Sequence, residues 1–399
     1  MKRLYEKTLN EHLDQYRQMV FVAGPRQVGK TTLCRSLVKE HEYFNWDNQD
    51  HRLIITQGPN KLAEEIGIHQ LRKEPLVLVL DEIHKYSKWK SFLKGLFDVQ
   101  GDRLKIIVTG SSRLDVFKKG GDSLMGRYFL YRLHPLSVRE IIGRDPEGME
   151  TSPPAHISSD AFDALYRFGG FPEPYLKANE RFFNRWRKLR KQQFFSEDIR
   201  DFSRVQEIHQ IELLAEMLAY QAGQLVNYSN LAGKVNVSVD TIRRWISTLE
   251  SMYYCFTIPP WSRNIPRSLL KQPKVYLWDW SALSDSGPRA ENFVASHLLK
   301  AVHWWTDNGY GDCALYFLRD KDKREVDFLV TRQGDPWIII EVKQGATKTV
   351  SKELRHFQRL IKAPHVFQTS FALDYIDADC FSLNEPMVVP AKTLLSQLV

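Results

Sequence analysis

The residues with the most recognisable chemistry lie in "FVAGPRQVGKTT", Phe21 to Thr32. Gly24 to Thr31 fits G-x-x-x-x-G-K-[ST] at every fixed position, a pattern typical of loops whose backbone N–H groups hold phosphate oxygens. Lys30 would reach the β- and γ-phosphates of ATP, and the Thr31 hydroxyl would ligate Mg²⁺. The predicted nucleotide-binding residues of this loop are Gly24, Gln27, Val28, Gly29, Lys30, Thr31 and Thr32.

A pair of acids follows a second apolar run. "LVLVLDEIHK" extends from Leu76 to Lys85 and reaches Asp81 and Glu82 after five apolar residues. An acid at this place can hold the magnesium shell, and a second acid directly after it can polarise the attacking water. We therefore predict Asp81 as a magnesium ligand and Glu82 as the catalytic base. The alternative is an ordinary solvated strand end.

Two further elements extend this candidate site. "LKIIVTGSSR", Leu104 to Arg113, ends in hydroxyl residues, of which Ser111 is the predicted nucleotide contact, with Thr109 and Ser112 as alternatives. Arg127 can stabilise transition-state charge, in cis or from a neighbouring subunit. A polar turn and a structural ion pair are the corresponding structural alternatives. A homo-oligomer is compatible with Arg127 acting in trans, but the sequence does not define the oligomeric state.

A second group of charged residues lies in the last third of the chain. Glu291 is near the start of a predicted helix, Asp327 lies in the predicted strand "REVDFLV", and Glu341 and Lys343 lie in the predicted strand "WIIIEVK". Side chains alternate along a strand, so Glu341 and Lys343 share one face. The turn "RQGDP" can join the two strands as a hairpin and bring Asp327 beside Glu341.

These four residues have the types that metal-dependent phosphodiester cleavage needs. Glu291, Asp327 and Glu341 can ligate Mg²⁺ or Mn²⁺, and Lys343 can orient the nucleophile and offset phosphate charge. Asp327, Glu341 and Lys343 are the predicted catalytic residues. Each also has a structural interpretation, since Glu291 can complement a helix dipole and "EVK" can be a solvated edge.

The elements that must position these residues follow from the apolar pattern. Met19 to Ala23 is a buried strand and Thr31 to Glu40 a helix, so the phosphate loop lies between a strand and a helix N-terminus. "EYFNWDN", Glu42 to Asn48, is a candidate additional strand with its loop. The predicted class is α/β, with a parallel sheet in the first third of the chain.

The ordered set of motifs resembles a group of prokaryotic AAA+ ATPases with a C-terminal domain of unknown function. The set comprises the phosphate loop, Asp81-Glu82, "TGSSR", "GRYFLYRLHPLSVREI" and "GGFPEPYL". The resemblance implies a sheet with the phosphate-loop strand near its centre and an extra strand before Asp81. The order Glu, Asp, Glu-x-Lys resembles the PD-(D/E)xK fold of Holliday-junction resolvases and restriction enzymes, although Val326 replaces the proline.

The middle of the chain contains two candidate nucleic-acid contacts. The stretch from Leu176 to Arg204 interleaves basic and aromatic residues, which fits either nucleic-acid binding or a packed amphipathic helix with a solvated basic face. Leu225 to Trp261 has the pattern of a winged helix, with Ser238 as the N-cap of its second helix. Arg243 and Arg244 would face DNA, but many winged helices bind only protein partners.

Composition sets the class of protein. The chain has 399 residues, a net charge of +8 and four cysteines without C-x-x-C spacing. These features favour a polyanionic partner, argue against disulfides and zinc, and indicate a cytoplasmic protein. No apolar run is long enough to span a membrane and no secretory signal is visible. Predicted domains are an ATPase core (1–150), a helical lid or linker (151–222), a winged-helix-like segment (223–265) and a nuclease-like domain (266–399).

The sequence therefore predicts an ATP-hydrolysing protein whose nucleotide state controls a DNA-facing, nuclease-like C-terminal module. A second hypothesis from another class is a regulatory switch. In that case the C-terminal fold does not cleave and binds a protein or DNA partner.

Overall fold

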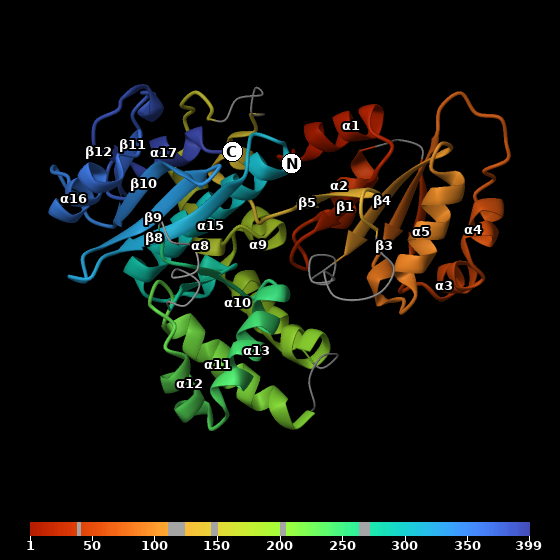
Figure 1. The fold of residues 1–399 in the computed structure, drawn as a ribbon, viewed down its shortest axis with the longest axis horizontal. Helices are drawn as coiled ribbons and strands as arrows, with labels where there is room; N and C mark the ends of the chain where they lie inside the picture. Colours follow the sequence, from red (N-terminus) through yellow and green to blue (C-terminus); the bar gives the residue numbers. More distant parts are fainter. Residues whose placement is uncertain (38–40, 111–123, 145–150, 200–204, 263–271) are drawn as a thin grey trace. The chain divides into compact units, whose positions relative to one another are not determined.

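The chain forms two compact units, Met1–His134 and Pro135–Val399. The structure is a computed structural model, and it describes residues 1–37, 41–110, 124–144, 151–199, 205–262 and 272–399. Figure 1 shows the first unit in red to orange and the second in yellow through blue. Among the described residues, no helix combines the length and the apolar composition that crossing a bilayer needs.

A five-stranded parallel sheet forms the centre of the first unit (Figure 1). Its order is β2-β3-β4-β1-β5. Strands β1 and β3 are buried along their whole length, as the uninterrupted apolar runs predict. Because all five strands run the same way, their carboxyl ends meet at one edge. The bounds are Met19–Ala23 (β1), Glu42–Asn45 (β2), Leu76–Asp81 (β3), Leu104–Gly110 (β4) and Tyr128–Arg132 (β5).

The strand expected within Glu42–Asn48 is present as β2 and pairs with β3 at the edge of the sheet. The phosphate-loop strand β1 lies one strand from the opposite edge, between β4 and β5. Strand β4 is inserted between β1 and β3, so its carboxyl end lies between the end of β1, where the phosphate loop begins, and the end of β3, where the acids lie.

Amphipathic helices cover this sheet. In α5, buried Trp89, Phe92, Leu93 and Leu96 recur at three- and four-residue spacing and join the core cluster with the strands. Asn48 begins α3 by accepting hydrogen bonds from two backbone N–H groups, and Pro59 begins α4. The helices are α1 (Glu6–Gln15), α2 (Lys30–Ser36), α3 (Gln49–Thr56), α4 (Pro59–Glu65), η1 (Ile83–Lys85) and α5 (Trp89–Gln100).

The second unit begins with helices. They are α7 (Val138–Ile142), α8 (Ser159–Phe168), α9 (Pro172–Lys177), α10 (Glu180–Gln193), the π-helical turn η2 (Phe194–Ile199), α11 (Val205–Tyr220), α12 (Tyr228–Val235) and α13 (Val239–Ser251). The predicted aromatic and basic stretch is α10, whose Phe183 and Trp186 are buried, so its aromatics serve packing. Ser238 caps α13 by accepting from the Thr241 N–H, as predicted.

A small hairpin follows α13. Strand β6 (Cys255–Ile258) pairs antiparallel with β7 (Lys274–Leu277). The hairpin is tied to the segment after α11, because Gly223 donates from its N–H to the Val275 carbonyl and Val226 donates to Pro273. Beyond β6, Trp261 donates to the Phe317 carbonyl of the next sheet. The helical part and the C-terminal sheet are therefore continuous through β6 and β7.

The C-terminal sheet is mixed, with the order β12-β11-β10-β9-β8. Strands β8, β9 and β10 are antiparallel neighbours, whereas β11 and β12 run parallel to β10. Gln333 and Gly334, both at positive φ, form the tight turn between β9 and β10. The elements are η3 (Trp280–Ala282), α15 (Ser286–Asp307), β8 (Cys313–Arg319), β9 (Glu325–Arg332), β10 (Asp335–Lys343), α16 (Lys352–Ile361), β11 (His365–Ser370), η4 (Cys380–Ser382), β12 (Met387–Pro390) and α17 (Ala391–Gln397).

The first unit ends at His134, earlier than the expected boundary at 150, and the remaining expected domains lie within one unit. The reason lies in α7, which packs on the C-terminal helix α17. Arg139 donates from Nη1 to the Ser396 carbonyl at 3.2 Å, and the Ser152 N–H donates to the Gln397 carbonyl at 2.8 Å. These contacts assign the segment after His134 to the second unit.

Candidate functional sites

The phosphate loop runs from the end of β1 to the start of α2. Gly24 lies so close to the chain after β5 that a Cβ there would approach the Leu133 carbonyl oxygen to 2.3 Å. Gln27 and Gly29 have φ values of 62° and 97°, in the left-handed region that glycine adopts most readily. The fold thus requires glycine at position 24 because of the close approach of Leu133, and favours glycine at position 29 because of the positive φ.

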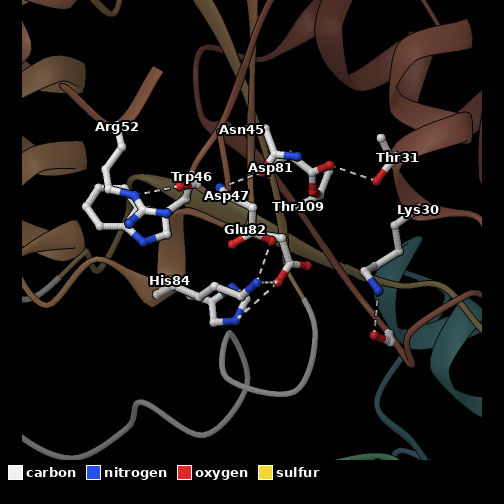
Figure 2. A network of polar contacts seen from close by, with 12 residues as sticks. Lys30, Thr31, Asn45, Trp46, Asp47, Arg52, Asp81, Glu82, His84 and Thr109 are labelled. Atoms are coloured by element: carbon white, nitrogen blue, oxygen red, sulfur yellow. Dashed lines mark hydrogen bonds and ion pairs between the residues drawn. The ribbon is translucent and has the colours of Figure 1, made fainter. Parts of the chain in front are cut away.

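Lys30 is the cation of this loop (Figure 2). Its ammonium donates to the carbonyl oxygens of Gly24 at 2.9 Å and Pro25 at 2.8 Å, and the side chain is buried. Burial lowers the pKa of Lys30 to about 8, although the carboxylates of Glu82 and Asp81 act in the opposite direction. A phosphate oxygen at the loop would supply the full counter-charge that the buried ammonium lacks.

Asp81 gathers three hydroxyl groups from three other elements. Its carboxylate accepts from Thr31 of α2 and from Tyr43 of β2, each at 2.8 Å, and from Thr109 of β4. Figure 2 shows Asp81 between Thr31 and Thr109. Since Thr31 and Asp81 already touch, the hydroxyl and the carboxylate expected around Mg²⁺ stand side by side, and this donor set fits that ion.

Glu82 directly follows β3 in a left-handed conformation, with φ of 56°. Its Oε2 is buried and lies 3.4 Å from Lys85 Nζ and 3.8 Å from His84 Nε2. Figure 2 shows Glu82 and His84 side by side. This oxygen accepts no hydrogen bond from the part of the chain that the structure describes. Strained backbone and an unsatisfied buried carboxylate oxygen are costly in free energy, and both are typical of functional sites.

The predicted nucleotide contact Arg127 is not close to the phosphate loop in this structure. Arg127 precedes β5 and donates its N–H groups to both oxygens of Asp98, at 2.8 and 3.0 Å. Its carbonyl accepts from Met19, at the start of β1, whereas the phosphate loop leaves the other end of that strand. Arg127 therefore pairs with Asp98 at the end of β1 opposite to the phosphate loop, and a role in trans stays a prediction. Ser111 and Ser112 lie outside the described residues.

An acidic centre lies in the second unit, where β7, α15 and β9 meet. Glu291 of α15 and Asp327 of β9, both predicted, are joined by Glu325 and by the ammonium of Lys274 on β7. Lys274 Nζ lies 2.8 Å from Glu325 Oε1, 3.2 Å from Glu291 Oε1 and 3.7 Å from Asp327 Oδ1. The Tyr276 hydroxyl donates to Glu291 Oε1 at 2.7 Å. Two predicted metal ligands thus surround a lysine.

Glu341 and Lys343 of β10 form the neighbouring part of this centre. Lys343 Nζ lies 2.7 Å from Glu341 Oε1, and Glu341 Oε2 accepts from the Ser351 hydroxyl at the start of α16. Asp327 Oδ2 accepts from the Val342 N–H at 2.8 Å, so the hairpin brings Asp327 beside Glu341 as the strand pattern indicated. All four residues of the predicted second site are close together.

The charges of the acidic centre are nearly balanced. Burial would lower the pKa of Lys274, but the carboxylates of Glu291, Asp327 and Glu325 raise it above its usual value. Burial and the Glu291 carboxylate raise the pKa of Asp327 to about 7, against the opposing effects of Lys274 and the Val342 N–H. Lys274 is therefore a fixed cation. Among the described residues, no group of three or more His, Cys, Asp or Glu side chains is arranged to hold a metal ion.

Comparison with known families finds matches for three segments of the chain. Residues 16–142 match the family described as an AAA domain. The N-terminal unit contains an AAA-type ATPase domain. Residues 159–285 and 286–394 match two families that are each described as a domain of unknown function. Lys274 and Glu291, which contact each other, therefore belong to segments that match different families.

Proteins similar over most of the chain are known from bacteria and archaea. An uncharacterized protein of Mycobacterium tuberculosis is 24% identical over 352 residues, covering 84% of this chain and 73% of that protein. One from Methanocaldococcus jannaschii is 22% identical over 357 residues, covering 86% and 78%. A solved Walker-type ATPase of Pyrococcus abyssi is 15% identical, with a TM-score of 0.41 over 69% of this chain and 93% of that one.

Sequence reasoning missed several residues of these sites, among them Tyr43 and Lys274. Tyr43 had a signal, because alternation along β2 puts Tyr43 and Asn45 on one face at the carboxyl end of the strand. Lys274 opens an apolar strand and looks like an ordinary solvated residue in the sequence. Its role depends on the packing of β7 against α15 and β9, which local patterns do not report.

Proposed function

We propose that this protein is an ATP-hydrolysing switch whose nucleotide state controls a DNA-facing second unit. The observation that carries the proposal is the convergence on Asp81, which accepts from Thr31 of the phosphate loop and from Thr109 of the adjacent strand. This contact joins the phosphate-binding loop to the acids at the carboxyl edge of the sheet. The arrangement is the one that phosphoryl transfer to water requires.

Each residue of the first site has a distinct task in this proposal. Lys30 and the backbone N–H groups from Gln27 to Thr32 bind the phosphates. A magnesium ion bound with the nucleotide, held by Thr31 and Asp81, would offset the charge of the phosphate oxygens. Glu82 accepts the proton of the attacking water at Oε2, the buried oxygen without a hydrogen bond from the described residues.

DNA is the partner that the surface of the second unit favours. Arg243 and Arg244 are exposed on α13, the second helix of the winged-helix-like segment. Arg243 lies over the Tyr228 ring at 4.3 Å, which fixes its direction, and Arg244 is 3.9 Å from Glu207. Helix α10 adds exposed Arg181, Arg185 and Lys188 on one face. Phosphate contacts from such positions would position a duplex.

The C-terminal sheet has a second candidate function, metal-dependent cleavage of DNA. The order α15, β8, β9, β10, α16, β11 and the grouping of Asp327, Glu341 and Lys343 support a nuclease-like fold. The donor set does not fit a divalent metal, however, because the Lys274 ammonium lies among Glu291, Glu325 and Asp327. We therefore propose that this module binds its DNA or protein partner without cutting it.

The test is ATP turnover by the full chain, with and without duplex DNA, compared with Lys30→Ala. The proposal expects magnesium-dependent hydrolysis that Lys30→Ala abolishes and that DNA alters. Hydrolysis that ignores DNA would exclude DNA as the controlled partner and favour a protein partner. The absence of hydrolysis in every condition would overturn the switch itself.

A further inference from the structure

We propose that Lys274 is a built-in cation that takes the place of a divalent metal in the acidic centre of the second unit. The inference builds on the proposed nuclease-like fold, because that fold leads one to expect a metal among Glu291, Asp327 and Glu341. It goes beyond that proposal by giving Lys274 the structural role that a bound metal ion would have in this centre. It also predicts which single substitution would convert the centre into a metal site.

The position of the ammonium is the first argument. Lys274 Nζ has carboxylate oxygens from α15 and from two positions of β9 around it, between 2.8 and 3.7 Å away. Its side chain is 3% exposed, so water hardly solvates the ammonium and the carboxylates must balance its charge. A structural metal ion holds carboxylates from separate elements together in a buried place, and the Lys274 ammonium does the same here. Here the chain itself supplies the charge.

The use of the oxygen atoms is the second argument. Glu291 Oε1 accepts from both Lys274 and Tyr276, and Asp327 Oδ2 accepts from the Val342 N–H. Both oxygens of Glu341 are engaged, one by Lys343 and one by Ser351. A metal entering this centre would have to break these contacts and to approach a lysine ammonium in a medium of low dielectric constant. Both steps are unfavourable.

The overall charge is the third argument. The carboxylates of Glu291, Glu325, Asp327 and Glu341 face Lys274, Lys343 and Arg319, which pairs with Glu325. With all four carboxylates ionised, one negative charge is left in excess, too little to favour a divalent ion over the lysine already in place. Buried charges are tolerated when they are paired and hydrogen-bonded, and this centre satisfies that condition without an external ion.

The connection of Lys274 to the rest of the unit suggests what the built-in cation does. Lys274 belongs to β7, which pairs with β6 and holds the segment after α11 through the carbonyls of Pro273 and Val275. Gly223 of that segment is so near Glu291 that a Cβ there would come within 3.2 Å of the carboxylate. Lys274 therefore fastens the winged-helix-like segment to α15 and β9. The acidic centre therefore connects the winged-helix-like segment with the C-terminal sheet and α15.

The experiment measures Mn²⁺ binding to the full chain without nucleotide. The loss of the free-ion signal in electron paramagnetic resonance reports the bound fraction. Wild type, Lys274→Met, Asp327→Asn, Lys274→Met with Asp327→Asn, and Lys343→Met are compared. Lys343→Met is the matched control, because it removes a partly exposed lysine of the same centre. We expect Lys274→Met to bind Mn²⁺ more than about tenfold tighter than wild type, since a like charge has been removed. Adding Asp327→Asn should abolish the gain, and Lys343→Met should produce a smaller one.

Several outcomes would overturn the inference. One is Mn²⁺ binding by wild type that Asp327→Asn removes and Lys274→Met does not strengthen. Another is an equal gain in Lys343→Met, which would show a general charge effect. If Lys274→Met does not fold, the comparison of wild type with Asp327→Asn still tests the inference. The inference requires the two proteins to bind Mn²⁺ equally, and weaker binding by Asp327→Asn would contradict it. ATP turnover by the same samples separates this result from a failure of the proposed switch.

Discussion

The Thr31 hydroxyl donates a hydrogen bond to a carboxylate oxygen of Asp81 at 2.8 Å, across 50 positions of sequence. Asp81 also accepts from Tyr43 and Thr109. The phosphate loop, the edge strand β2 and the inserted strand β4 are thus connected through one carboxylate. A change at any of the three hydroxyls would alter how this carboxylate is held.

The first prediction concerns Tyr43, which holds Asp81 from β2. Tyr43→Phe removes one of three hydroxyl donors to Asp81 and leaves the phenyl ring in place. A net hydrogen bond of about 0.5–1.5 kcal/mol corresponds to a fall in kcat for ATP of about two- to tenfold. Steady-state hydrolysis measures it, with the exposed Tyr16→Phe as the matched control. An unchanged kcat in Tyr43→Phe, or an equal fall in Tyr16→Phe, would refute this positioning role.

The second prediction concerns the arginines of α13. Replacing Arg243 and Arg244 by alanine should weaken binding to duplex DNA and reduce the slope of log affinity against log salt by about one per lost phosphate contact. Fluorescence anisotropy over a salt series measures both quantities. Arg185→Ala with Lys188→Ala on α10 removes the same charge elsewhere on the unit. If the α10 variant loses binding and the α13 variant does not, α10 and not α13 is the DNA contact.

The third prediction is a pH dependence of stability from His297 of α15. The buried ring accepts from the Val138 N–H at Nε2, at 3.1 Å, and its Nδ1 faces the Phe293 carbonyl at 2.8 Å. Burial lowers the pKa of His297 to about 3; the Phe293 carbonyl and Glu140 oppose this shift, and Lys300 adds to it. The unfolded chain therefore binds the proton first. This stabilisation is complete above about pH 6.5 and is lost as the pH falls toward 3.

His297→Gln provides the comparison, because glutamine keeps polar atoms but does not titrate. Between pH 7.5 and 5, wild type should lose about 2 kcal/mol more unfolding free energy than this variant. Urea unfolding at the two pH values measures the difference. Parallel losses in the two proteins would show that His297 does not titrate with unfolding.

The fourth prediction concerns the buried ion pair between Glu140 of α7 and Lys300 of α15, each with a side chain 2% exposed. Lys300→Met leaves the carboxylate buried without its cation and should cost about 3–5 kcal/mol of unfolding free energy. Glu140→Gln added to Lys300→Met removes the uncompensated charge and should restore part of the loss. A double variant that is no more stable than Lys300→Met would contradict this electrostatic explanation.

The sequence predicted what local patterns encode. Strands β1 and β3, the loop from Gly24 to Thr31 and the edge strand β2 follow from apolar runs and from the glycines of the motif. The hairpin of β9 and β10 follows from alternation on both sides of the Gln333-Gly334 turn. Asp327 and Glu341 were therefore placed together correctly, because the hairpin register decides their distance.

What the sequence did not predict depends on contacts between distant elements. For Arg127 the sequence left a nucleotide contact and a structural ion pair open; the parallel register of β5 with β1 places it at the far end of the sheet, beside Asp98. Lys274 enters the acidic centre only because β7 packs against α15. A charged residue at the start of an apolar strand carries no local sign of such a role.

The central claim is that Glu82 and the residues around Asp81 hydrolyse ATP and that the second unit responds to DNA. The most direct test measures ATP binding and ATP turnover of wild type and Glu82→Gln, with and without supercoiled DNA, in Mg²⁺ and in Mn²⁺. The account predicts that Glu82→Gln binds ATP as wild type does but loses nearly all turnover, that DNA changes the wild-type rate, and that the plasmid stays intact throughout. Full turnover in Glu82→Gln, or plasmid cleavage that Asp327→Asn abolishes, would contradict it.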